Sequence, residues 1–484
     1  MNYIIAHDFG TSSAKASLFT TEGELVASNT IAFETIHEQP NYAVQDANAW
    51  WQAFCDNNRA LLAGIEDPKV LCVSFSSAYP NCLLVDENAE PLHPAMIWQD
   101  TRAVEQAKRI SKALPEKYTA RAPGHVLSPD RSLVKLLWLK ENCPEVYAKA
   151  AKMLPCAASF IIMKLTGEAV TDYAVAYGTA MIQRGTKEWT DEVLEIAGVA
   201  PGLMPALHDR SDVVGTVDER ASAASGLPVG TKIVCGTVDS DCTCIGGGLL
   251  KPGDAFLLGG TSAEIDAIAP NGCKIGRPSS SSGASLKWMR DTVGLIEKEL
   301  EKTGGRGAFD LINEKAAEAP VGSSGVIFLP YLAGERGLRN DPFARGAFTG
   351  ISLSTTRECL IRAVIEGVGY NLNVMLQDIR DQGIEVTRLP VVGGLGKGAA
   401  VRQIFADILN VTLVTYEHMD EAAVAGAAVI GGIGLGLYDG VEAVSKFMRP
   451  AEETKPIPEN HEKYLALIPR FEAVYQALKT VYDK

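Results

Sequence analysis

Residues 236–248 read GTVDSDCTCIGGG and bring two carboxylates, two thiols and several glycines into one short stretch. These residue types could hold a metal, form a redox pair, bind a phosphate or supply a general base. Asp239 and Asp241 are two residues apart, as are Cys242 and Cys244, and residues two apart on a helix point about 200° away from each other. Neither a disulfide nor a shared metal suits the cysteine pair, and only one aspartate can face a cleft. A helix cap is the alternative role for Asp239.

A second chemical pattern, DFGTSSAK, lies near the start of the chain. Gly10 allows a sharp turn, and Thr11 and Ser12 offer amides and hydroxyls to phosphate oxygens. Asp8 precedes this turn, and a carboxylate at a strand end suits Mg²⁺. The turn recurs as LGGTS in the second half, with leucine in the place of Asp8. Repetition in the same setting favours two phosphate-binding hairpins and one metal over two ordinary turns.

The segment VVGGLGKGAAVRQIFADIL contains a glycine-rich loop that opens a helix. Such a loop suits the ribose or phosphates of a nucleotide, although by itself it also fits a tight connection. A dinucleotide-binding fold is disfavoured because the motif comes late in the chain and lacks the usual downstream acid.

Composition limits the classes of protein that these motifs can serve. The chain has 484 residues, which predicts two domains, and its formal net charge of −14 argues against nucleic-acid binding. No secretory signal is visible, and the ten cysteines lack the spacing of a zinc site or a disulfide framework, so we expect a cytoplasmic protein. The apolar tract at 422–437 is short and rich in glycine, which favours a buried helix over a membrane segment.

The elements that must position these motifs occur in two similar sets. IIAHDFGTSSAKASLF and AFLLGGTSAEIDAIAP both predict a strand, a Gly-Thr-Ser turn and a second strand. KIVCGTVDSDCTCI and LPVVGGLGKGAAVRQI both predict a strand, a glycine and a helix. These echoes predict a duplicated α/β domain, with the turns at strand ends lining a cleft between the copies.

Six segments occur in the order that is typical of FGGY carbohydrate kinases: DFGTSSAK, WQDTRA, the KLLW helix, GTS, LPYLAGER with GAFTG, and VVGGLGKG. The chain resembles this family from residue 1 to about residue 440, and it is most similar to xylulokinases. The resemblance implies an α/β fold with two actin-like, ribonuclease-H-like domains and a catalytic cleft between them. It implies a sugar-binding domain at 1–244, which includes the catalytic aspartate, and an ATP-binding domain at 245–484.

The resemblance also implies ATP and Mg²⁺ as cofactors and a small-molecule sugar or polyol as the substrate, without nucleic acid or membrane partners and with a possible homodimer. By the family pattern, Asp239 is the base and Asp8 binds the metal. The same pattern assigns ATP and phosphate contacts to Thr11, Ser12, Lys15, Gly260, Thr261, Gly394, Gly396 and Lys397, and substrate contacts to Ala78, Tyr79, Asp100, Asp130, Asp239 and Ser240.

Two segments depart from the xylulokinase pattern. SAYPNC replaces the usual Gln-Met-His-Gly stretch at 77–82, and the segment 264–285 looks shorter by about one hairpin. D-xylulose is the favoured substrate, with glycerol, an erythritol-type polyol, another ketose or an aldonic acid as alternatives. Arg131 could suit an aldonic acid, although a solvated arginine is the simpler interpretation. A non-enzymatic actin-like nucleotide-binding protein is a further alternative, which the presence of Asp239, both GTS turns and WQDTR disfavours.

Overall fold

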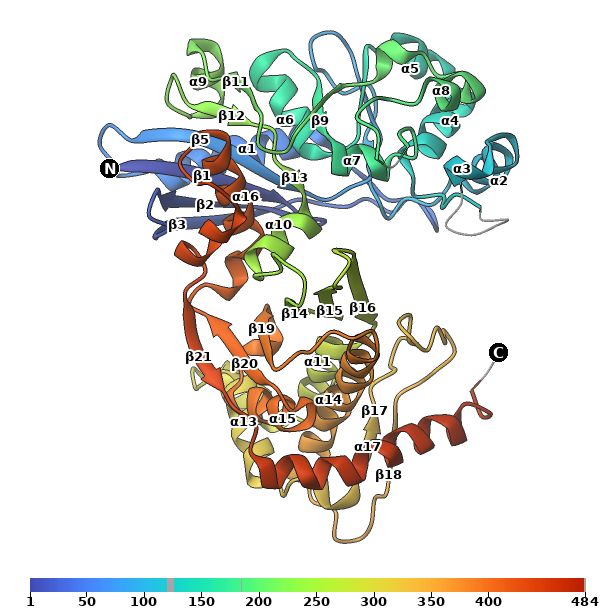
Figure 1. Ribbon diagram of the computed structural model, residues 1–484, viewed down its shortest axis with the longest axis vertical. Coiled ribbons are helices and arrows are strands. Elements are labelled where there is room, and N and C mark those ends of the chain that lie inside the picture. The colour runs from blue at the N-terminus through green and yellow to red at the C-terminus, as the bar shows by residue number, and fades with distance from the viewer. Residues whose placement is uncertain (120–125, 184, 483–484) are drawn as a thin grey trace. The chain divides into compact units, whose positions relative to one another are not determined.

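The computed structural model describes residues 1–119, 126–183 and 185–482, and the chain forms two compact units. Unit 1 contains Met1–Gly246 and Ala423–Phe447, and unit 2 contains Gly247–Ala422 and Met448–Lys484. The chain therefore enters unit 2 after Gly246 and returns to unit 1 for one helical segment. Each unit is built on a mixed β-sheet with helices packed on it, which confirms the predicted α/β class (Figure 1).

The main sheet of unit 1 has seven strands in the order β11-β12-β5-β1-β2-β3, with β13 also paired to β5. Strands β1, β2 and β3 form an antiparallel meander, and β5 runs parallel to β1. The strands are β1 (Asn2–Phe9), β2 (Ser13–Thr20), β3 (Leu25–Ala32), β5 (Lys69–Ser77), β11 (Val213–Thr216), β12 (Lys232–Val234) and β13 (Thr237–Val238).

Helices cover both faces of this sheet, which explains why β1 and β5 are buried along most of their length. On one face, the buried ring of His7 packs 4.5 Å from the ring of Phe54 in α1 (Ala47–Leu62), beside α6 (Ala157–Thr166) and α9 (Glu219–Ser225). On the other face lies α16 (Ala422–Gly434), where a Cβ on Gly431 would lie 3.0 Å from the side chains of Cys72 and Ser74 (Figure 1). The buried helix predicted for the apolar tract is confirmed.

The rest of unit 1 consists of three two-stranded sheets and shorter helices. The sheets pair β4 (Val44–Gln45) with β7 (Ala95–Met96), β6 (Leu83–Val85) with β8 (Lys152–Leu154), and β9 (Val170–Asp172) with β10 (Ala206–His208). The helices are α2 (Val104–Ala113), α3 (Glu116–Thr119), α4 (Ser132–Asn142), α5 (Pro144–Lys149), α7 (Tyr173–Gly178), α8 (Asp191–Ala197) and α10 (Asp239–Gly246).

Unit 2 contains a six-stranded sheet in the order β16-β15-β14-β19-β20-β21. Its strands are β14 (Ala255–Gly259), β15 (Ala263–Ile268), β16 (Lys274–Ser279), β19 (Arg388–Val392), β20 (Thr412–Tyr416) and β21 (Pro450–Thr454), and β17 (Ile327–Leu329) pairs separately with β18 (Ala347–Thr349). Its helices are α11 (Ser282–Thr292), α12 (Leu295–Lys302), α13 (Ala308–Glu318), α14 (Arg357–Asp381), α15 (Ala399–Leu409) and α17 (Pro458–Leu478). Among the described helices, α14 alone has the length and apolar composition of a membrane span, but it is mostly buried, as is typical of a core helix.

The first predicted echo is confirmed by strand register. In the β1–β2 hairpin Asp8 lies opposite Lys15, and in the β14–β15 hairpin Leu258 lies opposite Glu264. Each hairpin continues into a third antiparallel strand, and the first strand of each lies beside a parallel strand, β5 in unit 1 and β19 in unit 2. The two sheets therefore repeat one topology.

The second predicted echo paired the wrong strands. Strand β19 lies next to β14, so its counterpart in unit 1 is β5, whereas β12 occupies the position of β20. The segment β12–β13–α10 therefore corresponds to the segment β20–α16 in the repeat. A short strand, a glycine and a helix recur several times in this chain, and only long-range pairing decides which of them correspond. The helices α10 and α16 pack closely, since a Cβ on Gly426 would lie 2.1 Å from the carbonyl oxygen of Cys242.

Candidate active site

Asp239 lies where β13 ends and α10 begins. Its Oδ1 accepts a hydrogen bond from the backbone N–H of Ser240 at 2.8 Å. Two residues earlier, Thr237 donates its hydroxyl to Asp172 Oδ2 at 2.7 Å, and Asp172 also caps the N-terminus of α7 by accepting from the N–H groups of its first turn. The buried carboxylate of Asp172 thus links β13, the strand just before Asp239, to the N-terminus of α7.

The surroundings of Asp239 favour the protonated form of its carboxyl group. Burial raises the pKa of Asp239 to about 7, and the negative charge of Asp8 is the next largest cause. Asp8 lies at the end of β1 and accepts a hydrogen bond from Ser76 Oγ at 2.6 Å. A carboxylate with a pKa near neutrality is suited to accept a proton in the transition state.

Two side chains from outside the β1–β2 turn hold Thr11 in place. Gln45 donates to the carbonyl oxygen of Thr11 at 2.6 Å, and the indole N–H of Trp98 donates to the Thr11 hydroxyl at 3.0 Å. Ser12, at the tip, is exposed, and Lys15 faces Asp8 across the hairpin. The sequence therefore predicted the turn, but it did not single out Gln45 or Trp98. Trp98 could have been found, because it belongs to the WQDTR motif.

A second group of residues from the sequence analysis consists of Tyr79, Asp130 and Arg131, and we call it the Tyr79 group. The ring of Tyr79 packs on α7, where a Cβ on Gly178 would lie 2.3 Å from the ring. Burial raises the pKa of Tyr79, and the carboxylates of Asp241 and Asp239 raise it further, whereas Arg131 lowers it. Tyr79 therefore lies within electrostatic reach of both aspartates and of the arginine.

Asp130 and Arg131, the other members of the Tyr79 group, lie just before α4. Arg131 donates to the carbonyl oxygen of Gly178 at 3.3 Å, and its Nε lies 3.9 Å from Asp130 Oδ1. Asp130 Oδ1 is buried and accepts no hydrogen bond. A buried carboxylate oxygen without a hydrogen-bond donor is costly, so a bound water or a ligand hydroxyl that reached this atom would relieve that cost.

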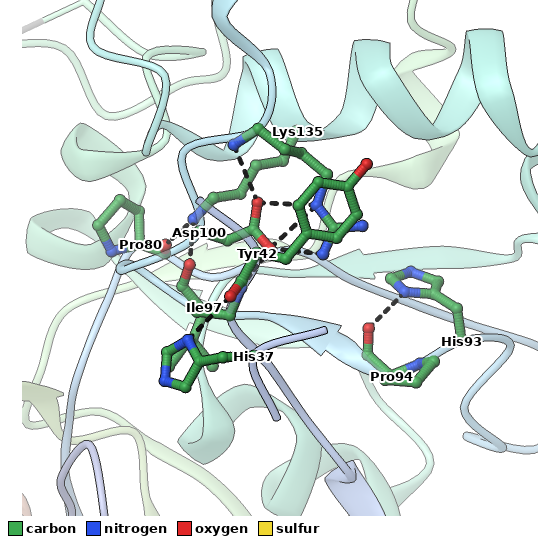
Figure 2. Close-up of polar contacts among 10 residues, drawn as sticks. His37, Tyr42, Pro80, His93, Pro94, Ile97, Asp100 and Lys135 are labelled. Carbon is green, nitrogen blue, oxygen red and sulfur yellow. Dashed lines mark hydrogen bonds and ion pairs between the residues drawn. The ribbon is translucent and has the colours of Figure 1, made fainter. Parts of the chain in front are cut away.

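Two predicted substrate residues are placed differently. Asp100 (Figure 2) is fully buried. Arg102 donates to its carboxylate at 2.6 Å, and the backbone N–H of Ala43 donates to it at 2.9 Å. Its oxygens are therefore used by the protein. Ala78 is nearly buried, and its N–H donates to the carbonyl oxygen of Phe9 at 2.8 Å. Both residues are buried, and the protein itself uses the carboxylate oxygens of Asp100 and the N–H of Ala78.

Unit 2 contains a pocket of about 790 Å³. It is formed by the turn after β14, the helices α11 and α13, and the loop that leads into α15, and the residues that line it include Gly260, Thr261, Gly283, Lys287, Trp288, Asp291, Phe309, Asp310, Asn313, Gly394, Lys397 and Gly398. Four predicted nucleotide residues are thus brought together: Gly260, Thr261, Gly394 and Lys397. Gly396 does not line the pocket, because it is buried behind the loop against Val391 and Thr415.

The wall of this pocket contains a turn pressed against a helix N-terminus. The N–H of Ala284 in α11 donates to the carbonyl oxygen of Thr261 at 2.9 Å, and a Cβ on Gly283 would lie 2.1 Å from the carbonyl oxygen of Gly260. The turn therefore lies at the positive N-terminal end of α11, a position that favours anions. The aromatic residues Trp288 and Phe309 were not predicted, because they come much later in the sequence than the turn, on α11 and α13.

The residues present suit a nucleotide and Mg²⁺. The volume and mixed apolar and polar lining of the unit 2 pocket match small-molecule sites. Asp8 supplies the oxygen donor that Mg²⁺ prefers, and that ion is usually held by one or two carboxylates plus substrate phosphates and water. Within the described ranges, no three His, Cys, Asp or Glu residues form a cluster that could hold a metal without a ligand's help.

Two units that repeat one sheet topology define a protein of the two-domain, actin-like α/β class. Residues 3–246 match the N-terminal domain, and residues 234–435 the C-terminal domain, of the FGGY family of carbohydrate kinases. The chain therefore belongs to the FGGY family and is a carbohydrate kinase. FGGY kinases use ATP, which agrees with the predicted cofactor.

The relatives share the whole length of the chain. A gluconokinase from Bacillus subtilis (strain 168) is 28% identical over 501 residues, covering 100% of this chain and 97% of that protein. A gluconate kinase structure from Lactobacillus acidophilus has a TM-score of 0.83 and 27% identity, covering 99% of each chain. A ligand-bound xylulose kinase structure from Lactobacillus acidophilus has a TM-score of 0.82 and 26% identity, covering 100% of this chain and 99% of that chain. These similarities support a sugar kinase and leave its sugar open.

Proposed function

We propose that this chain transfers the γ-phosphoryl group of ATP to a hydroxyl of a neutral sugar or polyol, with Asp239 as the general base. The first candidate reaction converts D-xylulose to D-xylulose 5-phosphate. The observation that carries the proposal is the place of Asp239 at the start of α10, at the same edge of the sheet as Asp8, where burial and the charge of Asp8 raise its pKa to about 7. Such a carboxylate can orient a substrate hydroxyl and accept its proton at neutral pH.

The Tyr79 group supports binding of the acceptor in unit 1. Asp130 Oδ1, which has no donor in the protein, would accept from a second hydroxyl, and Arg131 and Tyr79 offer donors to further oxygens. Carboxylates outnumber cations here, since Asp239, Asp241 and Asp130 face one arginine. This balance favours a neutral, hydroxyl-rich acceptor over an anion.

The pocket of unit 2 supports binding of the nucleotide. Its apolar wall, with Trp288 and Phe309, suits a base, and its turn at Gly260 and Thr261 suits phosphates. Lys397 lies at the pocket and also pairs with Asp420 at 2.6 Å. The pocket is large enough for a nucleoside triphosphate.

The β1–β2 hairpin of unit 1 supports a phosphate role for Thr11, Ser12 and Lys15, and Asp8 would hold Mg²⁺. Bound Mg²⁺ neutralises phosphate charge, which is a large part of the barrier in phosphoryl transfer. The protein holds the hairpin in place beforehand, because Gln45 and Trp98 fix both oxygens of Thr11.

An aldonic acid is the second candidate acceptor. Arg131 is partly exposed beside the Tyr79 group, and it precedes the N-terminus of α4, where a carboxylate is stabilised by the helix dipole. The relatives named gluconokinase and gluconate kinase give this candidate further support. Asp130 opposes it, because its carboxylate lies close to the same guanidinium.

The test is a coupled assay of ADP release with Mg-ATP and a panel that contains D-xylulose, other ketoses, glycerol, erythritol and D-gluconate. We expect one neutral acceptor to give the highest kcat/KM, and Asp239→Asn to lower its kcat by a factor on the order of 10³. ATP binding, followed by isothermal titration calorimetry, should persist in this variant.

Asp241→Asn is the matched control, because it removes the neighbouring carboxylate from the same helical turn. It should retain most of the activity. Near wild-type turnover by Asp239→Asn would refute the assignment of Asp239 as the base. A preference for D-gluconate would mean that the acceptor is an aldonic acid and not a neutral sugar or polyol.

A further inference from the structure

Lys135 is a lysine without solvent contact in the first turn of α4, and the proposed chemistry leaves it unused. Its exposed fraction is 0%, and a cation so close to a helix N-terminus is opposed by the helix dipole. Burial of an ammonium group is costly unless its donors are satisfied by well-placed acceptors. Its partners should therefore explain why the fold retains it.

The acceptors of Lys135 are two backbone carbonyls from different loops. Its Nζ donates to the carbonyl oxygen of Pro80 at 2.9 Å and to that of Ile97 at 2.6 Å (Figure 2). Pro80 directly follows Tyr79, and Ile97 directly precedes Trp98. Lys135 thus joins the loop that carries Tyr79, a proposed sugar-binding residue, to the loop that carries Trp98, which holds Thr11 in place.

The same two loops are joined by a second set of hydrogen bonds. Ser132, three residues before Lys135 on α4, donates its hydroxyl to the carbonyl oxygen of Asn81 at 2.6 Å. The side chain of Asn81 in turn accepts from the backbone N–H of Trp98 at 3.1 Å. The first turn of α4 therefore holds both loops from beneath, with Lys135 as its charged member.

We infer that Lys135 is a positioning residue of this kinase, which fixes the Tyr79 loop in the geometry that binds the sugar and the Trp98 loop in the geometry that holds Thr11. This inference rests on the proposed function only in placing the sugar at Tyr79. Lys135 itself lies behind the backbone of both loops, so it acts through them and does not touch the substrate. Charge-assisted hydrogen bonds are the stronger kind, which suits a residue that must hold two loops at once.

The charge of Lys135 is sensitive to pH. Burial lowers the pKa of Lys135 to about 8, the carboxylates of Asp100 and Asp130 and the thiol of Cys82 oppose this shift, and the guanidinium of Arg131 adds to it. Asp100 is itself paired with Arg102. Loss of the proton above pH 8 should weaken both hydrogen bonds and loosen the two loops.

The experiment compares Lys135→Met and Ser132→Ala with wild type and with Lys149→Met, an exposed lysine on α5 of the same unit. We expect KM for the sugar to rise about tenfold in Lys135→Met and about threefold in Ser132→Ala, with Kd for ATP unchanged. In wild type, KM for the sugar should rise above pH 8, and this dependence should be absent from Lys135→Met. Lys149→Met should behave as wild type.

Hydrogen exchange without substrates separates this inference from the proposed function. Residues 78–82 and 97–100 should lose protection in Lys135→Met, whatever the substrate is. An unchanged KM in folded Lys135→Met, or unchanged exchange of both loops, overturns the positioning role. A wild-type protein that releases no ADP with any acceptor overturns the proposed function, and the exchange result then still decides the role of Lys135. Ser132→Ala keeps the KM test available if Lys135→Met does not fold.

Discussion

Asp8 and Asp239 lie at the carboxyl ends of two strands that flank β5, and Ser76 on β5 has Asp8 in register on one side and Thr237 on the other. Both carboxylates therefore lie at the same edge of the unit 1 sheet. Their repulsion contributes to the raised pKa of Asp239. The same edge thus offers one carboxylate that suits a cation and one that suits a proton.

The first prediction concerns the pH dependence of turnover. Because Asp239 must be ionised to act as a base, kcat/KM for the sugar should rise with pH up to about pH 7, before loss of the Lys135 proton lowers it above about pH 8. Asp8→Asn removes a negative charge, so the apparent pKa of this ascending limb should fall, even though the variant also loses a metal ligand and turns over more slowly. Glu87→Gln, an exposed acid of unit 1, should leave the limb in place. A limb that stays near pH 7 in Asp8→Asn would contradict the coupling between the two carboxylates.

The second prediction concerns stability. A carboxyl whose pKa is raised on folding stabilises the folded state below its unfolded pKa of 3.8, and this stability is lost as pH rises through the folded value of about 7. Asp239→Asn should therefore stabilise the protein at pH 8 by about 1–3 kcal/mol, a discounted part of the ~4 kcal/mol that the full pKa shift represents. Urea unfolding at pH 5 and pH 8 measures it. A gain of the same size at both pH values would show that ionisation of Asp239 is not the cause.

Some features could be predicted from the sequence because they are local. A strand, a Gly-Thr-Ser turn and a second strand are specified within about fifteen residues, so both hairpins were found. Asp239 could be placed at a helix start because glycines and an apolar run surround it. The small-residue composition of α16 likewise predicted that this helix is buried.

Other features depend on pairing between distant segments. The sequence could not show that β20 rather than β19 is the counterpart of β12 in the repeat, because that order is set by long-range strand pairing. Asp100 looked like a substrate residue, but Arg102 and the backbone of Ala43 use its oxygens. The burial of Lys135 between two carbonyls was equally invisible, since its helix reads as an ordinary amphipathic segment.

The third prediction concerns the nucleotide pocket. Gly283→Ala would bring a Cβ to within 2.1 Å of the carbonyl oxygen of Gly260, which is backbone and cannot rotate away. The turn at Thr261 should shift, and Kd for ATP should rise about tenfold, while KM for the sugar changes little. Isothermal titration with ATP measures the first effect. Gly202→Ala, where a Cβ meets nothing within 4 Å, is the control. Wild-type affinity in Gly283→Ala would argue against ATP in this pocket.

The fourth prediction separates the two candidate acceptors. Asp130→Asn leaves the volume of the side chain but removes the buried acceptor charge, so KM for a neutral sugar should rise about tenfold. Arg131→Gln should raise that KM by only about threefold, because the arginine already donates to Gly178. An aldonic acid substrate would reverse the order, with Arg131→Gln as the more damaging change. Steady-state kinetics of both variants with D-xylulose and D-gluconate decide between the two.

The last prediction concerns the crossing of α10 and α16. Gly426→Ala would place a Cβ 2.1 Å from the carbonyl oxygen of Cys242, so the two helices must move apart. Overpacking of this kind costs about 1–3 kcal/mol, which should lower the Tm of the first transition by roughly 3–8 °C.

Turnover should fall as well, because α10 carries Asp239 at its first residue. Since a displacement of about 1 Å at a catalytic group can cost on the order of 10²-fold in rate, we expect kcat to fall more than stability alone would explain. Calorimetry and ADP release on Gly426→Ala and Gly202→Ala measure both effects. A variant with lowered Tm and unchanged kcat would mean that α10 holds Asp239 in place independently of α16.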